Sequence, residues 1–330
     1  MLAIVLALAA GWAGYWFIGS SAVKSGVADW FEDRRAEGWT AEYGALSVAG
    51  FPNRFDTTLD AVALEDPASG LGWRAPFIQI MALSYRPNHV IVIWPETQSF
   101  TDRGRAMTLD STDMRASLVV APSTALAPER VALTAEGLSL RPEGAALSEA
   151  LSASSLRLAA ERVEGAEARY HLGLAAADVA PAASLLAQIE GGGDLPRVID
   201  SITADITADF TAPWDRAAIE AARPQPTRIE IIGMAMAWGG MALDAAGTLE
   251  VDAGGMPSGT LTLTARGWRD MLDAAEASSL LTSDMATTAE RALTMMSGGQ
   301  DTLEMPLRFG EGRVWIGPLP IAPAPVLRLQ

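Results

Sequence analysis

The chain begins with an apolar run that carries no charge from Leu2 to Val23. As a helix, this run would be about 33 Å long at about 1.5 Å per residue, close to the roughly 30 Å hydrocarbon core of a bilayer. Its aromatic residues gather in its second half, as is typical near a membrane interface. We therefore expect residues 1–23 to be a membrane anchor or signal segment. The candidate anchor residues are Leu2, Val5, Leu6, Leu8, Trp12, Tyr15, Trp16, Phe17 and Ile18.

Two other interpretations of this run stay open. Ser20-Ser21-Ala22 offers a small-x-small site at which a signal peptide could be cleaved, although the apolar part of a signal peptide is usually shorter, at about 7–15 residues. A buried core helix would normally show a polar stripe, which this run lacks. We favour an uncleaved anchor with the bulk of the chain on one side of the membrane.

The pattern after the anchor changes from helix to strand. Val23, Val27, Trp30 and Phe31 recur at helical spacing, which predicts a juxtamembrane helix over 24–38 that Gly38 ends. From Trp39 onward, apolar and polar residues alternate, which predicts a β-rich half over 39–190. Further strands are expected at Phe55–Asp60, Phe77–Tyr85, Val90–Trp94, Met114–Val120, Arg130–Leu140, Ser155–Glu161 and Ala168–Leu174, with Arg86–His89 as a turn.

The second half, 191–330, predicts hairpins and short helices and is expected to continue the first half. In Ser201–Phe210, isoleucine and alanine alternate with threonine and aspartate, so one face is apolar and the other polar. Gly239-Gly240 predicts a two-residue hairpin turn. Expected strands are Thr227–Trp238, Met241–Val251, Gly259–Ala265, Leu303–Phe309 and Arg313–Leu319, and expected helices are Pro181–Glu190, Pro213–Ala222 and two amphipathic helices between Trp268 and Met296.

These elements predict an α+β fold that is mostly antiparallel β. We expect an N-terminal transmembrane helix followed by a large curved antiparallel sheet, or two stacked sheets, with a few amphipathic helices. A chain of 330 residues can bury a large core without disulfides.

Composition excludes several functional classes. The chain has no cysteine and two histidines, so disulfides, thiol nucleophiles and iron–sulfur clusters are excluded and a multi-histidine metal centre is not expected. A net charge of -16 argues against nucleic acid as a partner. We expect no cofactor, no metal and no catalytic residues.

The remaining candidates for chemistry are weak. His89 and His171 could each serve as a general base, but the sequence pairs neither with a nucleophile. Asp205 and Asp209 share a strand face and could bind a cation, although a solvated polar face explains them better. Gly191-Gly192-Gly193 lacks the lysine of a phosphate loop and is interpreted as a linker.

Several short segments resemble a known family. Gly50-Phe51-Pro52-Asn53-Arg54-Phe55, Trp73-Arg74-Ala75-Pro76 and Tyr85-Arg86-Pro87-Asn88-His89-Val90 resemble domain-of-unknown-function family 2125 (DUF2125), a Gram-negative envelope protein family. The segment from Gly312 to Leu319 is similar to the closing strand of AsmA-like proteins. The motif residues are Gly50, Phe51, Pro52, Arg54, Trp73, Pro76, Pro87, Asn88, His89, Gly312, Trp315, Gly317 and Pro318.

The resemblance implies an inner-membrane anchor, a periplasmic bulk and an AsmA-like β-groove associated with phospholipid. We therefore expect a protein that binds or handles lipid, or maintains the envelope, through an apolar β-groove. The expected partners are the inner membrane, a phospholipid or another envelope lipid, and envelope proteins. The alternative is a periplasmic protein-interaction scaffold without a ligand, and an enzyme is a third, less favoured reading.

Overall fold

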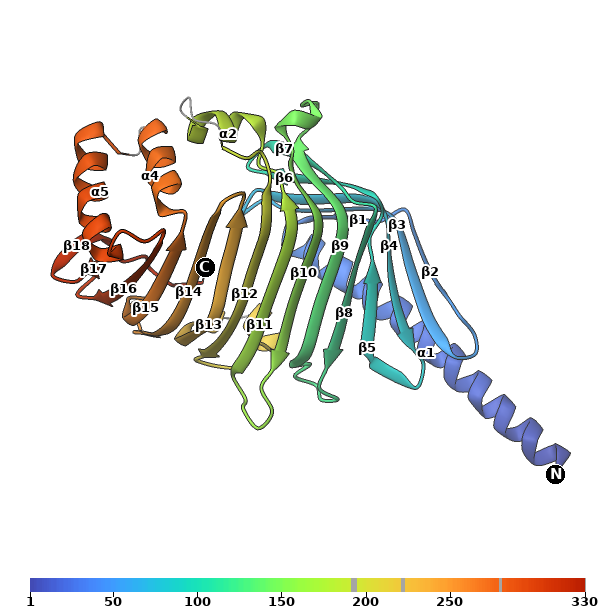
Figure 1. Ribbon diagram of the computed structural model, residues 1–330. Coiled ribbons are helices and arrows are strands. Elements are labelled where there is room, and N and C mark those ends of the chain that lie inside the picture. The colour runs from blue at the N-terminus through green and yellow to red at the C-terminus, as the bar shows by residue number, and fades with distance from the viewer. Residues whose placement is uncertain (191–194, 221–222, 279–280, 330) are drawn as a thin grey trace. The chain divides into compact units, whose positions relative to one another are not determined.

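The computed structural model describes residues 1–190, 195–220, 223–278 and 281–329 (Figure 1). Over these residues the chain forms an N-terminal apolar helix, antiparallel sheet structure of eighteen strands and a few further helices. This confirms the expected fold class. The chain divides into two compact units, Met1–Pro122 with Val131–Ala146 and Ser123–Arg130 with Leu147–Gln330.

The first unit contains one long helix and the first strands. Its elements are α1 (Leu2–Ala36), β1 (Thr40–Glu42), β2 (Ala45–Ala49), β3 (Arg54–Asp66), β4 (Leu71–Leu83), β5 (Arg86–Ile93), β6 (Thr97–Asp102), β7 (Arg105–Asp110), β8 (Asp113–Val120) and most of β9 (Pro128–Pro142). The anchor and the juxtamembrane segment are thus one continuous helix.

Among the described residues, the second unit contains the remaining strands, four α-helices and one 3₁₀ helix. Its elements are the 3₁₀ helix η1 (Leu147–Glu149), β10 (Leu151–Arg162), β11 (Arg169–Val179), α2 (Ala183–Glu190), β12 (Ile199–Phe210), α3 (Arg216–Glu220), β13 (Pro226–Trp238), β14 (Met241–Val251), β15 (Pro257–Arg266), α4 (Trp268–Ala277), α5 (Ser283–Ser297), β16 (Thr302–Gly310), β17 (Arg313–Ile316) and β18 (Leu319–Pro323).

The sheet of the first unit is organised around β3 and β4. One edge of β3 pairs with β1 and then β2, and its other edge pairs with β4. β4 pairs with β6 through its first residues and with β5 through its last, so the sheet forks along β4. β5 then pairs with β8, β6 with β7, and β7 with β9.

Helix α1 packs on this sheet through a buried apolar cluster. Phe31 contacts Ala41, Leu59 and Val62, all of which are buried. Leu59 and Val62 lie three positions apart on β3, where simple alternation would place them on opposite faces. Ala61 between them has a φ of +50°, and this irregularity turns both side chains towards the helix.

The strands of the second unit pair with their sequence neighbours, from β10 to β18. Such local antiparallel pairing needs only short connections. Gly239-Gly240 makes the predicted hairpin, with Trp238 opposite Met241. At one end, α4 and α5 pack on the sheet through the buried residues Trp268, Ala265 and Leu303 (Figure 1).

Some expected boundaries were wrong. Arg86–His89 is not the turn, because β5 begins at Arg86 and Leu83 pairs directly with it across Ser84-Tyr85. The strands β2, β6, β7 and β18 were not anticipated as separate elements. α3 ends at Glu220, and residues 221–222 of the expected helix, like the Gly191–Gly193 linker, lie outside the described residues.

Candidate functional site

Three aromatic side chains of α1 form hydrogen bonds with one end of the first unit's sheet. The indole nitrogen of Trp12 donates to the Pro52 carbonyl at 2.9 Å, and that of Trp16 donates to the Arg54 carbonyl at 2.7 Å. The Tyr15 hydroxyl donates to the Ser84 carbonyl at 2.6 Å. Each bond joins the helix to one of two loops, β2–β3 or β4–β5, or to the start of β3.

The segment Gly50–Arg54 forms much of the surface of the sheet on which α1 packs. Gly50 has a φ of +97°, and a Cβ there would lie 2.8 Å from the Arg54 Cβ and 2.9 Å from its carbonyl oxygen, so the turn requires glycine. Asn53 and Arg54 both donate their amides to the Gly50 carbonyl. The Phe51–Pro52 bond is cis. The motif residues of this segment therefore shape the surface on which α1 lies.

The helix approaches this surface closely at Gly19. A Cβ at Gly19 would lie 2.6 Å from the Cζ atom of Phe55. Trp16 is buried, with its ring 6.1 Å from the Phe55 ring and edge-on to Phe51 at 5.5 Å. The close contact of a glycine with an aromatic ring fixes the position of α1 along its own axis.

Much of the apolar run of the same helix is exposed. Leu2, Val5, Leu6, Leu8, Phe17 and Ile18 are all exposed. α1 is long and apolar enough to cross a membrane, and only 6% of its most apolar window is buried. This excludes a buried core helix for the described residues, and it gives weak support to an anchor.

The second unit carries a sheet with two chemically different faces. Residues directly opposite each other across β10–β17 form rows, and the rows alternate between apolar and polar. One polar row consists of Glu161, His171, Thr207, Glu230, Thr248, Thr260, Arg308 and Trp315. The opposite face, which we call the apolar face, carries aliphatic residues, as the alternation in Ser201–Phe210 predicted.

Among the described residues, the buried side chains of the apolar face lie near its ends, and Met305 of a middle row packs against the cluster at the α4 and α5 end. Trp268, Ala265 and Leu303 are buried at the α4 and α5 end, and Tyr170, Ala208 and Leu249 are buried near the other. The two middle rows contain no buried residue among those described, and Leu158 and Met234 are 38% and 40% exposed. The first middle row consists of Leu158, Leu174, Ala204, Met234, Ala245, Leu263 and Met305. The second consists of Ala160, Leu172, Ile206, Ile231, Gly247, Leu261, Leu307 and Ile316.

The other motif residues make structural contacts. Trp73 donates its indole N–H to Gln98 at 2.9 Å, and Asn88 donates its amide to the Val120 carbonyl at 3.1 Å. In the second unit, Arg308 stacks over Trp315, whose indole N–H donates to the Gly310 carbonyl. Gly312 and Gly317 have φ of +71° and +56°, and Pro87 and Pro318 lie in or beside strands.

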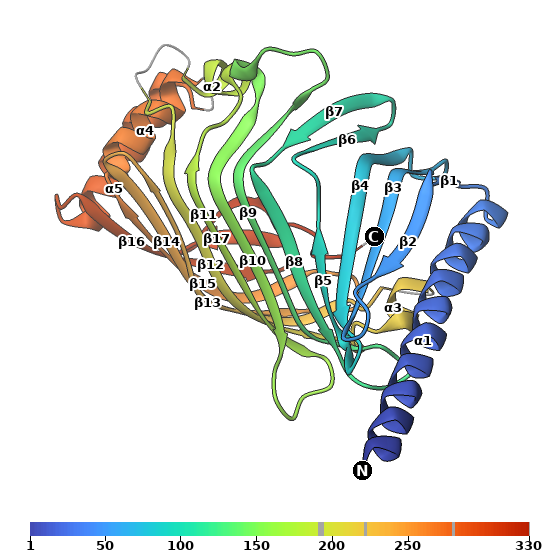
Figure 2. The same ribbon diagram turned by 90° about the vertical axis from the view of Figure 1, so that its right-hand side faces the viewer.

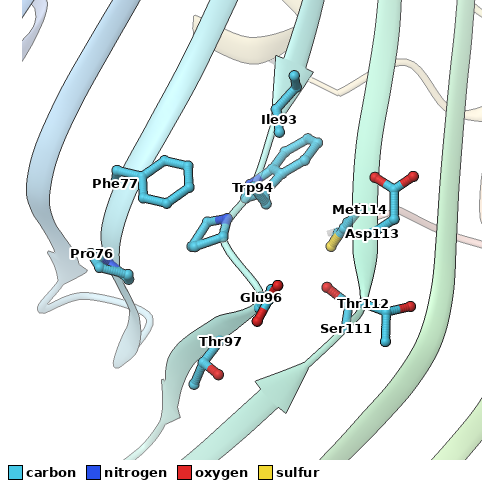
Figure 3. Close-up of a pocket in the computed structure, with 11 residues that line it drawn as sticks. Pro76, Phe77, Ile93, Trp94, Glu96, Thr97, Ser111, Thr112, Asp113 and Met114 are labelled. Atoms are coloured by element: carbon cyan, nitrogen blue, oxygen red, sulfur yellow. The ribbon is translucent and has the colours of Figure 1, made fainter.

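One cavity of about 480 Å³ lies at the fork of the first unit's sheet. Its wall contains Pro76, Phe77 and Trp94 on one side and Glu96 and Thr112 on the other (Figure 3). A second cavity of about 450 Å³ lies around Asp205 and Gly233 in the second unit. Both cavities mix apolar and polar walls.

The two histidines do not form a catalytic constellation in the described residues. His89 Nε2 lies 2.9 Å from the Ser117 hydroxyl, without an acid in the same hydrogen-bonded group. His171 Nε2 lies 2.6 Å from the Asp205 carboxylate, and both side chains are about half exposed on the polar face. Asp209 is ion-paired with Arg169. Among the described residues, no group of three or more potential ligands is placed to hold a metal ion.

A comparison with models of protein families identifies the family of the chain. The family model described as "Uncharacterized protein conserved in bacteria (DUF2125)" matches residues 16–325. The chain belongs to the DUF2125 family. Among curated proteins, none matches it. The match begins at Trp16, so the DUF2125 region includes the part of α1 that docks through Trp16 and Gly19.

Sequence reasoning identified Gly50–Arg54 as a DUF2125 motif but missed what it does. Phe55, which ends that quoted segment, completes the docking surface together with Ser84 and Gly19, and the last two were not singled out. The helical run gave no local signal for this contact, because its partners lie 34 or more positions away in the chain. The abundance of aromatics between Trp12 and Phe17 was the one available sign.

Proposed function

We propose that this DUF2125 protein is anchored by α1 in the inner membrane, with its bulk in the periplasm, and binds the acyl chains of a lipid along the apolar face of its second unit. The observation that carries the proposal is the pair of uncovered middle rows. An aliphatic strip that is only half-buried, with Leu158 and Met234 exposed, is costly in water, since each buried methylene contributes about 0.8 kcal/mol. A bound acyl chain would supply the missing cover.

The docking of α1 supports an uncleaved anchor over a cleaved signal peptide. Cleavage after Ala22 would remove Tyr15, Trp16 and Gly19 and expose the buried Phe55 and the fully buried Ser84. Exposed aromatic surface of this kind is unfavourable. The periplasmic location is motivated by the family resemblance and by the absence of cysteine, which lets the body fold without disulfides in an oxidising compartment.

Photocrosslinking tests the lipid site. The full chain is reconstituted in vesicles that contain phosphatidylethanolamine with a diazirine in its acyl chain, illuminated, and digested for mass spectrometry. We expect adducts on Ile206, Ile231 and Leu261. We expect none on the polar row of the opposite face of the sheet, which runs from Glu161 to Trp315. Adducts confined to α1 would overturn the lipid site.

Two neighbouring residues on β15 provide matched variants. Leu261 points to the apolar face, and Thr262 points to the polar one. Leu261→Asn places an amide in the middle row, so we expect at least a tenfold loss of crosslinking, equivalent to about 1.4 kcal/mol. Thr262→Asn should leave the yield unchanged. Circular dichroism of both variants checks that the sheet still forms.

A protein-interaction scaffold is the second candidate. The observation that favours it is β18, in which all five residues are exposed and Leu319 and Ile321 present large apolar side chains. An exposed strand can pair with a strand of another protein. Photocrosslinkers at Leu319 and Ile321 that capture a defined envelope protein would favour this function.

A further inference from the structure

Two loops of the first unit expose aromatic side chains beside the anchor. We call Gly50–Asn53 and Ser84-Tyr85 the tip loops. Phe51 is 54% exposed and Tyr85 is 60% exposed. The Phe51 ring stacks on Phe17 of α1 at 5.9 Å. The exposed aromatics of the helix and of the tip loops thus lie together.

The tip loops lie at the end of the sheet from which the helix emerges. Arg54 pairs with Leu83, and the Ser84 amide donates to the Asn53 carbonyl at 2.8 Å, so the two loops are neighbours. The N-terminal turns of α1 extend beyond this end of β2–β5 (Figure 2). Within the first unit, the tip loops therefore lie beside the turns of α1 that would enter a membrane.

The polarity of the loops limits how deep they can lie. Loop backbone at hydrocarbon depth would leave polar groups without partners, so the tip loops cannot lie in the hydrocarbon core although the uncharged run of α1 continues to Val23. Trp12, Tyr15 and Trp16 donate to loop carbonyls, and indole and phenol side chains favour the interface between headgroups and acyl chains. These restraints place the headgroup region at the level of Trp12–Phe17, so that residues 2–11, about 15 Å of helix at about 1.5 Å per residue, would enter the hydrocarbon and reach about half of its depth.

The charge of this end matches an anionic membrane surface. The chain carries a net charge of -16, yet the segments 50–55 and 84–89 contain Arg54, Arg86 and no acidic residue. Arg54 is paired with Asp56, whereas Arg86 has no ion pair among the described residues. A basic side chain near anionic headgroups is attracted to them. The opposite end of β3 and β4 carries Asp66 and Glu65, of which Glu65 is ion-paired with Arg74.

We infer that the tip loops are a second membrane contact, in which Phe51 and Tyr85 insert into the headgroup region beside α1. The inference rests on the proposed anchor and adds that the sheet is seated directly on the bilayer. A loose tether would leave the tip loops in water. The hydrogen bonds of Trp12 and Tyr15 to the loops, and that of Trp16 to the start of β3, hold the loops at a fixed depth relative to the helix.

Single-cysteine labelling tests the inference, because the chain has no cysteine of its own. Phe51→Cys, Tyr85→Cys and Leu71→Cys are each labelled with the environment-sensitive fluorophore NBD in the full chain. Leu71 is the matched control, since it is 56% exposed and begins β4 at the end opposite to the tip loops. The labelled proteins are reconstituted in vesicles of phosphatidylethanolamine and phosphatidylglycerol, with or without lipids brominated near the headgroup end of the acyl chain.

The expected result is blue-shifted emission and quenching by brominated lipid at positions 51 and 85, with neither at 71. Vesicle flotation is measured in parallel. Protein that floats but shows the same aqueous emission at all three positions would overturn the inference and leave the anchor intact. Protein that does not float overturns the anchor and the inference together. A blue shift at 51 and 85 without quenching shows that protein covers the tip loops, which also overturns it.

Discussion

The hydroxyl of Tyr15 donates a hydrogen bond of 2.6 Å to the carbonyl oxygen of Ser84, a residue 69 positions later in the chain. Ser84 is fully buried in the turn between β4 and β5, and its own hydroxyl and amide point to Pro52 and Asn53. This one bond therefore connects the apolar helix to both tip loops. It makes the helix part of the folded unit.

Tyr15→Phe should loosen this connection while preserving the ring. Removing one partner of a hydrogen bond typically costs about 1 kcal/mol, so the free energy of local opening at the Ser84 amide should fall by about that amount. Hydrogen exchange with mass spectrometry on residues 50–55 and 84–86 measures it. Tyr85→Phe is the control, because this neighbouring tyrosine is exposed. Equal effects of the two substitutions would contradict the role of Tyr15.

Gly19→Ala should displace α1 from the sheet. Alanine favours a helix over glycine by about 1 kcal/mol, but the new Cβ would lie 2.6 Å from Phe55, and overpacking costs about 1–3 kcal/mol. Faster exchange of the Arg54 amide is expected. Gly14→Ala is the matched control, since no atom lies within 4 Å of its Cβ position, and it should stabilise the helix. The docking geometry is wrong if both variants behave alike.

Local patterns predicted the main elements because their causes are local. The uncharged run predicted α1, and the alternation in Ser201–Phe210 predicted both the strand β12 and its two faces. The alternation of apolar and polar residues does not show which rows of the sheet are covered by helices. The open middle rows depend on where α4 and α5 pack, which no short segment encodes.

The missed features depend on long-range contacts or on atypical composition. β6 reads Thr-Gln-Ser-Phe-Thr-Asp and lacks an aliphatic stripe, yet it is held between β4 and β7. The turn was placed at Arg86–His89 because proline and asparagine favour turns. The pairing of Leu83 with Arg86 instead leaves these residues in an irregular stretch of β5.

Trp268→Ala should strongly destabilise the second unit. Trp268 is 2% exposed, contacts the sheet with Ala265 and Leu303, and donates its indole N–H to the Gln300 carbonyl at 3.1 Å. Truncating a buried tryptophan costs about 3–5 kcal/mol. Urea unfolding, followed by hydrogen exchange of β15 and β16, should show this loss.

An exposed methionine on α5 gives the control for that measurement. Met295 is among the most exposed apolar side chains of the helix, and Met295→Ala should change the free energy of unfolding by no more than about 0.5 kcal/mol. A loss of similar size in both variants would mean that α4 does not depend on Trp268 for its packing.

Asp66 should make the β3–β4 turn sensitive to acid. Its carboxylate accepts hydrogen bonds from the Ser69 hydroxyl at 2.7 Å and from the Ala68 amide at 2.9 Å, and these bonds, with that of Ser69 first, lower the pKa of Asp66. A lowered pKa in the folded state means that the turn binds fewer protons than the unfolded chain. The stabilisation is therefore complete above the unfolded pKa of about 3.9 and is lost as the pH falls through the lower folded value.

The pH dependence can be isolated by comparing wild type with Asp66→Asn. The melting temperature of the variant should lie below that of the wild type at neutral pH, and the difference should shrink as the pH falls below about 4. Ser69→Ala removes the main partner of the carboxylate, so Asp66→Asn in that background should show a smaller pH-dependent difference. A difference that stays constant from neutral to acidic pH would show that the charge of Asp66 does not hold the turn.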